Sequence, residues 1–235
     1  MAKLAVYFFC SCFSKMNLIL FKTFRNFRLM LLSFYQNNFI EAGCDEAGRG
    51  CYAGPVFAAA VILPKDFSHP LLNDSKKVSE KNRLLLKEVI EYNAVAWAVA
   101  RVEHDEIDRI NILKASIKAM HLAIQQLKIT PEFLLIDGNR FQQYQKIPHL
   151  CVIKGDGKYA SIAAASILAK THRDAYMKKL HKKFPAYNWI NNKGYGTLDH
   201  RNAIAEIGLC KYHRKSFSIL PNPPDLFNLE DLHKK

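Results

Sequence analysis

Acidic residues follow three separate apolar runs of the chain, each time beside a glycine or within two residues of one. Asp45 and Glu46 follow the first run, Asp137 follows the second, and Asp156 follows the third. An acid in such a place most often marks only the point where a strand meets solvent. Three strand ends of one sheet can nevertheless meet at a common edge, where their carboxylates would repel one another unless cations neutralise them.

Oxygen ligands alone favour a hard cation, Mg²⁺ or Mn²⁺, over zinc. Two such ions about 4 Å apart can hold both the attacking and the leaving oxygen of a phosphodiester. In a basic chain, the four acids therefore indicate metal-dependent phosphodiester chemistry.

Two glycine-flanked segments could bind the substrate of such a site. Gly48-Arg49-Gly50 directly follows the first acids. Glycine lets a ligand approach the backbone, and arginine offers a planar fork of donors that suits phosphate. Alone, this triplet is more typical of an ordinary turn between strands. The second segment carries Tyr195 between two glycines, either as a half-buried turn residue or as a ring that stacks on a sugar or base.

The composition is that of a globular protein with a strong basic excess. Of 235 residues, 49% are hydrophobic and 23% are charged, which excludes wholesale disorder. The net charge of +13 suggests a polyanionic partner, either nucleic acid or an anionic membrane surface. Residues 1–29 contribute only part of this charge, so the basic character belongs to the rest of the chain.

Residues 1–29 differ from the rest because they contain basic residues and no acid. Cys10-Ser11-Cys12 is a poor signal-peptide cleavage site, and the basic residues interrupt any window long enough to cross a membrane. A basic amphipathic membrane anchor stays open. We favour an upstream start codon, with Met30 as the true start, residues 30–235 as one catalytic domain, and a helical C-terminal part from about residue 185.

The apolar pattern predicts a strand meander followed by alternating helices and strands, and hence a mixed α/β sheet. Strands are expected at 39–44, 55–63, 94–102, 133–136 and 150–153. Helices are expected at 79–92, with Ser79 as N-cap, and at 111–127, 161–183 and 199–207. The six cysteines form no C-x-x-C pair and are expected to be reduced core residues of a cytoplasmic protein.

Together, the acidic and glycine-rich segments resemble the motifs of the ribonuclease HII family. Asp45–Gly50, followed by Ala53–Val56, is similar to the opening motif of that family. Further motifs follow in the family's order at 73–77, 136–139, 154–156, 163–170, 173–174, 193–195 and 213–217. The resemblance covers about residues 39–220, which is nearly the whole chain beyond the extension.

The resemblance implies a ribonuclease H-like fold: a mixed five-stranded sheet flanked by helices, with a helical C-terminal extension. It also implies an endoribonuclease that hydrolyses the RNA strand of RNA–DNA hybrids. The same enzyme would nick on the 5′ side of single ribonucleotides in duplex DNA and leave 3′-hydroxyl and 5′-phosphate ends. Such a protein is expected to be a cytoplasmic monomer whose partner is nucleic acid and not a membrane.

Roles for individual residues follow from their places in these motifs. Asp45, Glu46, Asp137 and Asp156 would be the catalytic acids and would hold the two metal ions. Gly48, Arg49 and Gly50 would contact the 2′-hydroxyl and the adjacent phosphate, and Tyr195 would stack at the ribo–deoxyribo junction. The candidate phosphate contacts are Lys76, Lys77, Lys170, Arg214 and Lys215. Asp174 is expected to pair with a basic side chain on a helix surface and not to bind a metal ion.

Two positions depart from the family pattern. Gly196 stands where the family commonly has proline, and Cys51 stands where proline, alanine or another small residue is usual. Neither change removes a metal ligand or Tyr195, so we expect an active enzyme. A catalytically silent hybrid-binding protein is the first alternative, although all four acids are present. A membrane-associated or exported protein, in which residues 1–29 are functional, is the second.

Overall fold

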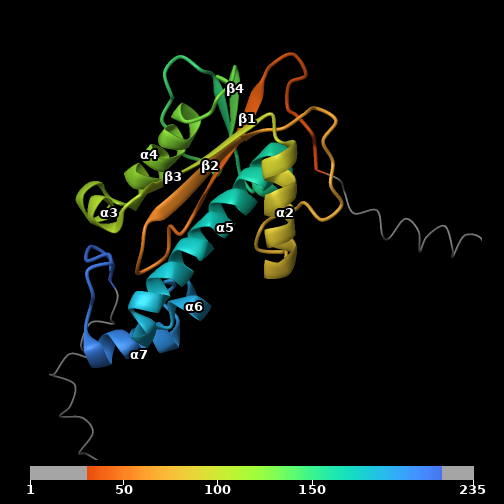
Figure 1. Cartoon of the computed structure of the whole chain (residues 1–235). Coiled ribbons are helices and arrows are strands. Elements are labelled where there is room, and N and C mark those ends of the chain that lie inside the picture. Colours follow the sequence, from red (N-terminus) through yellow and green to blue (C-terminus); the bar gives the residue numbers. More distant parts are fainter. Residues whose placement is uncertain (1–30, 219–235) are drawn as a thin grey trace, which may run out of the picture. The chain divides into compact units, whose positions relative to one another are not determined.

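The computed structural model describes residues 31–218, in which five strands form one mixed sheet (Figure 1). The strands are β1 (Glu41–Ala47), β2 (Val56–Ile62), β3 (Ala96–Val102), β4 (Phe133–Asp137) and β5 (His149–Val152). Their spatial order is β3-β2-β1-β4-β5, with β1, β2 and β3 antiparallel and β1, β4 and β5 parallel. The carboxyl ends of the three parallel strands therefore lie at one edge of the sheet.

Helices cover both faces of this sheet (Figure 1). They are α2 (Glu80–Asn93), α3 (His104–Ile110), α4 (Ile112–Gln125), α5 (Ala160–Lys183), α6 (Trp189–Asn192) and α7 (Leu198–Ile207), with short 3₁₀ turns η1 (Gly155–Gly157) and η2 (Pro185–Tyr187). The α3–α4 pair shares one apolar core with the sheet, and α2 and α5 share another on the opposite face. Every residue of β2 is consequently buried, as its uninterrupted apolar run predicts.

The contact between β1 and α5 is unusually close at Gly43. A Cβ there would lie 2.2 Å from the carbonyl carbon of Ser161, so no residue larger than glycine fits. Along β1, Cys44 belongs to the core shared with α4, and its neighbour Asp45 points to the α5 side, where it interacts with Ser166. This packing places the small-residue half of α5 beside the first acid.

The predicted strands and helices are confirmed to within about three residues at their ends. Ser79 is the N-cap of α2, and its hydroxyl accepts a hydrogen bond from the amide of Asn82 at 3.3 Å. The exceptions are α3, a short polar helix, and α6, a helix of four residues, neither of which the sequence pattern predicted. Asn111, with a φ of 70°, separates α3 from α4 and caps α4 through its side chain.

Several predictions concern residues outside 31–218, including the extension at 1–29 and the start at Met30, and these stay predictions. The cysteines of the described part, Cys44, Cys51, Cys151 and Cys210, are free thiols. None of the helices in this part combines the length and apolar character that a membrane crossing requires.

Candidate active site

Three parallel strand ends bring the predicted acids to one place. Asp45 lies near the carboxyl end of β1 with Glu46 beside it, Asp137 is the last residue of β4, and Asp156 lies in η1 after β5. Asp137 is their shared neighbour, because its charge acts on Asp45, on Glu46 and on Asp156. The structure therefore joins the four acids into one electrostatic cluster.

Burial and repulsion oppose the ionisation of the first two acids. Burial, and then the charges of Glu46 and Asp137, raise the pKa of Asp45 well above its usual range, and the hydroxyl of Ser166 offsets only part of this rise. Burial also raises the pKa of Glu46, although Arg49 opposes the shift. The Nη1 atom of Arg49 lies 3.1 Å from Glu46 Oε1 and gives Glu46 a counter-ion, whereas Asp45 forms no ion pair with any residue of 31–218.

Asp156 has a further acidic neighbour. Burial, followed by the charges of Asp74 and Asp137, raises the pKa of Asp156 to about 6, and the charge of Lys76 lowers it. The raised pKa values of Asp45, Glu46 and Asp156 share one cause besides burial, namely other carboxylates close by. A cation among these side chains would relieve the repulsion.

The donor types and charges of this cluster fit a divalent cation, but its oxygens do not stand in ligand positions. Among residues 31–218, no three acidic, histidine or cysteine side chains are close enough together to hold a metal ion. Some of the carboxylate oxygens bond to the protein instead. Asp45 Oδ1 accepts from the Glu46 amide at 2.6 Å, and Asp137 Oδ1 accepts from the Gly155 amide at 2.7 Å.

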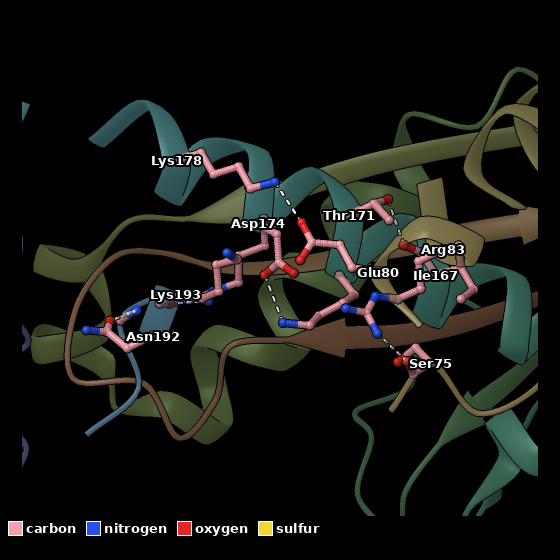
Figure 2. A network of polar contacts seen from close by, with 12 residues as sticks. Ser75, Glu80, Arg83, Ile167, Thr171, Asp174, Lys178, Asn192 and Lys193 are labelled. Atoms are coloured by element: carbon pink, nitrogen blue, oxygen red, sulfur yellow. Dashed lines mark hydrogen bonds and ion pairs between the residues drawn. The ribbon is translucent and has the colours of Figure 1, made fainter. Parts of the chain in front are cut away.

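Sequence reasoning missed the buried residues that contact Asp45 and link it to the loop before α2. The hydroxyl of Ser166, which interacts with Asp45, lies within hydrogen-bond distance (2.8 Å) of the hydroxyl of Ser75, and both serines are buried. Arg83 Nη1 in turn donates to the carbonyl oxygen of Ser75 at 3.0 Å (Figure 2). The available signal was the Asn73–Lys77 motif, whose lysines suggested phosphate while its serine anchors the loop to α5.

The glycine triplet forms a tight turn after β1. The amide of Cys51 donates to the carbonyl oxygen of Gly48 at 3.4 Å, and Arg49 and Gly50 between them are exposed. Gly48 has a φ of 96°, and a Cβ there would lie 2.0 Å from Arg173 Nε, so the fold itself requires glycine. Gly50 has neither constraint, since nothing lies within 4 Å of the Cβ that it lacks.

Tyr195 lies beside this turn through an antiparallel bridge to Cys51. Burial, and then the Cys51 thiol, raise the pKa of Tyr195 to about 12, while 40% of the residue stays exposed. The glycine at position 196 has a structural reason, because a Cβ there would lie 2.3 Å from the ring of Tyr52. Tyr52 thus occupies the space that a proline at position 196 would need.

Three of the predicted phosphate contacts are exposed lysines, and a fourth lies against the Tyr195 ring. Lys76 and Lys77 lie on the loop beside Asp156, and Lys215 lies near the end of the described chain. Lys170 Nζ is 2.8 Å from Asp174 and 5.7 Å from the centroid of the Tyr195 ring. Figure 2 shows Asp174 near the ion pair of Lys178 with Glu80.

The structure contradicts the predicted phosphate contact by Arg214. Its side chain is fully buried and donates to the carbonyl oxygens of Gly48, Arg49 and Gly54 at 2.8 to 3.0 Å. The basic side chain therefore supports the glycine turn from inside the protein. Its neighbour in the sequence, Lys215, remains exposed.

Comparison with known proteins agrees with this arrangement. A family model described as Ribonuclease HII matches residues 42–220. The ribonuclease HII of Bacteroides fragilis is 65% identical over 191 residues, which are 81% of this chain and 95% of the relative, and that of Parabacteroides distasonis is 64% identical over 192 residues, or 82% and 96%.

Solved structures agree as well. The ribonuclease HII in a complex with PCNA from Archaeoglobus fulgidus is 25% identical with a TM-score of 0.65, covering 82% of this chain and 99% of that one. The ribonuclease H2 of Pyrococcus horikoshii, 22% identical with a TM-score of 0.63 over 76% and 94% of the two chains, shares the fold. The predicted ribonuclease H-like fold is thereby confirmed, and with the family model and the close relatives it follows that the chain belongs to the ribonuclease HII family.

Proposed function

We propose that the chain is an endoribonuclease that cuts the RNA strand of RNA–DNA hybrids and nicks duplex DNA on the 5′ side of single ribonucleotides, leaving 3′-hydroxyl and 5′-phosphate ends. The observation that carries this proposal is the meeting of four acids, around Asp137, at the carboxyl edge of the parallel strands. The glycine turn lies next to this cluster, directly after β1. The enzyme would act in the cytoplasm as a monomer.

The metal ligands would be Asp45, Glu46, Asp137 and Asp156, whose hard oxygen donors suit Mg²⁺ or Mn²⁺. Burial and the repulsion between neighbouring carboxylates favour a cation among these side chains. Two bound ions would supply activation of the attacking water and stabilisation of the leaving 3′-oxygen.

Recognition of the ribonucleotide would come from the glycine turn and from Tyr195. The amides of Arg49 and Gly50 donate to no acceptor within residues 31–218, and the space beside Gly50 is open. These amides are free to bind the 2′-hydroxyl, which is the group that distinguishes RNA from DNA. The exposed part of the Tyr195 ring would stack on the adjoining sugar, while Lys76 and Lys77 would contact phosphates and fix the position of the duplex.

The test is cleavage of a DNA duplex that carries one ribonucleotide, with Mg²⁺ and then with EDTA, alongside the Asp45→Asn variant. We expect a metal-dependent nick on the 5′ side of the ribonucleotide for the wild type. The variant should bind the duplex but not cut it. Wild-type turnover in Asp45→Asn would remove Asp45 from the ligand set. Tight binding without cleavage by the wild type would favour a silent binding protein.

A further inference from the structure

Two buried arginines lie behind the glycine turn. Arg173 of α5 is 1% exposed and Arg214 is 0% exposed. Each of their side-chain nitrogens donates to a backbone carbonyl oxygen. Arg173 reaches Pro55 (3.1 Å), Lys193 (2.9 Å) and Ala53 (3.1 Å) from Nε, Nη1 and Nη2, and Arg214 reaches Gly54 (3.0 Å), Arg49 (2.8 Å) and Gly48 (2.8 Å) in the same order.

The two side chains join segments that are far apart in the sequence. Arg173 binds both the loop after the turn, at Ala53, and the Tyr195 loop, at Lys193. Its Cζ atom also lies 5.9 Å from the centroid of the Tyr195 ring. Arg214 arrives from the end of the described chain and holds the turn itself. The arginine pair therefore connects the turn to the Tyr195 loop from inside the protein, in addition to the backbone contacts of Cys51 with Tyr195 and of Tyr52 with Gly194.

The pair is costly for the fold. Within residues 31–218 neither arginine forms an ion pair, so two like charges are buried near each other. Their hydrogen bonds go to carbonyl oxygens, and one aromatic ring lies beside each guanidinium, that of Tyr195 beside Arg173 and that of Phe217 beside Arg214. Burial lowers the pKa of Arg214 to about 10, which reflects the unfavourable environment of its charge. Neutral side chains of similar volume would carry no such penalty. Retention of both charges beside the candidate site points to a role in that site.

The hydrogen bonds of Arg214 show what this role is. The carbonyl of Gly48 and the amide of Arg49 belong to one peptide group, and the carbonyl of Arg49 and the amide of Gly50 belong to the next. Arg214 binds both of these carbonyl oxygens, and the amides of the same two peptide groups donate to no acceptor in the described part of the chain. A cation on the oxygen of a peptide group polarises it and makes its N–H a stronger donor.

We propose that Arg173 and Arg214 are positioning residues that fix the glycine turn against the Tyr195 loop and strengthen the two free amides of the turn, and that the pair thereby sets the preference for a ribonucleotide over a deoxyribonucleotide. The proposal rests on the proposed function, since the amides must bind a 2′-hydroxyl for the preference to exist. It assigns to the pair no contact with the substrate.

The experiment uses the active enzyme in Mg²⁺ and two duplexes that differ in one 2′-hydroxyl. KM is measured for the duplex with a single ribonucleotide, and the inhibition constant Ki is measured for the matched all-DNA duplex. Arg214→Lys and Arg173→Lys keep the charge but lose the planar fork. We expect the ratio of Ki to KM to fall about tenfold through KM alone, the equivalent of one lost or weakened hydrogen bond. Arg109→Lys, at an exposed arginine of α3, is the matched control.

The outcomes separate the two proposals. A wild type that does not cut the ribonucleotide duplex would refute the proposed function. If the wild type cuts this duplex and the folded lysine variants keep the same ratio of Ki to KM as the wild type, the role of the arginine pair is refuted. A fraction of unfolded, inactive enzyme in a preparation cannot produce the expected result. KM and Ki are measured on the same preparation, and neither depends on the concentration of active enzyme. Failure of both variants to fold in thermal melts would also overturn the inference, since the pair would then serve stability alone.

Discussion

Gly50→Ala tests whether the glycine at position 50 is required by the substrate, in contrast to Gly48, which is required by the fold. Gly50 has no positive φ, and no atom of the described residues lies within 4 Å of the position that its Cβ would take. The change should therefore alter the free energy of unfolding by less than about 0.5 kcal/mol, as at other open surface positions. The new methyl group would nevertheless lie where a sugar must approach the turn. A displacement of about 1 Å at a reacting centre can lower the rate about 100-fold, so we expect a loss of that order in kcat/KM.

Gly48→Ala should behave in the opposite way. The alanine would adopt a φ near 96° and meet Arg173 Nε at 2.0 Å. Backbone strain of about 1–3 kcal/mol and disturbance of the Arg173 hydrogen bonds should lower the melting temperature by several degrees. Gly208→Ala supplies a control for strain without a ligand. It has a φ of 77° with open space around its missing Cβ and lies at the end of α7, so stability should fall while kcat/KM stays unchanged.

The assay pairs thermal melts with kcat/KM on a duplex that carries one ribonucleotide. The informative result is a Gly50→Ala protein that melts like the wild type and cuts about 100-fold less well. Wild-type kcat/KM in that variant would refute the reasoning, because it would mean that nothing approaches the turn at Gly50. A large loss of stability would refute it as well, since the open space beside Gly50 would then be occupied by the protein itself.

Three further results are expected. Tyr195→Ala should reduce cleavage of single-ribonucleotide duplexes about 10-fold more than cleavage of long hybrids, because a lost stack costs about 1–3 kcal/mol; equal losses in steady-state assays would remove its junction role. Mg²⁺ should raise the melting temperature at neutral pH and EDTA should reverse the gain, as binding among repelling acids requires; a metal-independent melt would contradict the predicted ligands. Burial, and then the charge of His200, lower the pKa of His213 to about 4 from a value near 6.5. The neutral imidazole therefore contributes to the free energy of unfolding fully above pH 6.5, and this contribution is lost as the pH falls toward 4. His213→Asn should flatten the fall of melting temperature over that range, and parallel melting curves for variant and wild type would contradict this role of His213.

The sequence predicted the acids and the sheet because both leave local signals. An apolar run that ends at an acid can be recognised from neighbouring residues, and the order of strands along the chain follows from such runs. The role of Arg214 leaves no local signal. Its side chain binds Gly54, 160 positions earlier, and an arginine in a basic segment has the same sequence pattern whether it faces phosphate or carbonyl oxygens. Ser166 was hidden for a related reason, since a small residue in a helix is equally typical of close packing and of a contact with Asp45.

The net charge of +13 was a sound guide to the class of partner but is a poor guide to the strength of binding. Arg173 and Arg214 contribute to it, yet both are buried and direct their hydrogen bonds to carbonyl oxygens of the protein. The dependence of binding on salt follows the number of phosphates that a protein contacts, and not its net charge. Affinity for nucleic acid should therefore fall with salt concentration less steeply than the charge excess suggests. The slope of log affinity against log salt concentration should reflect the number of exposed lysines beside the acids that contact phosphates.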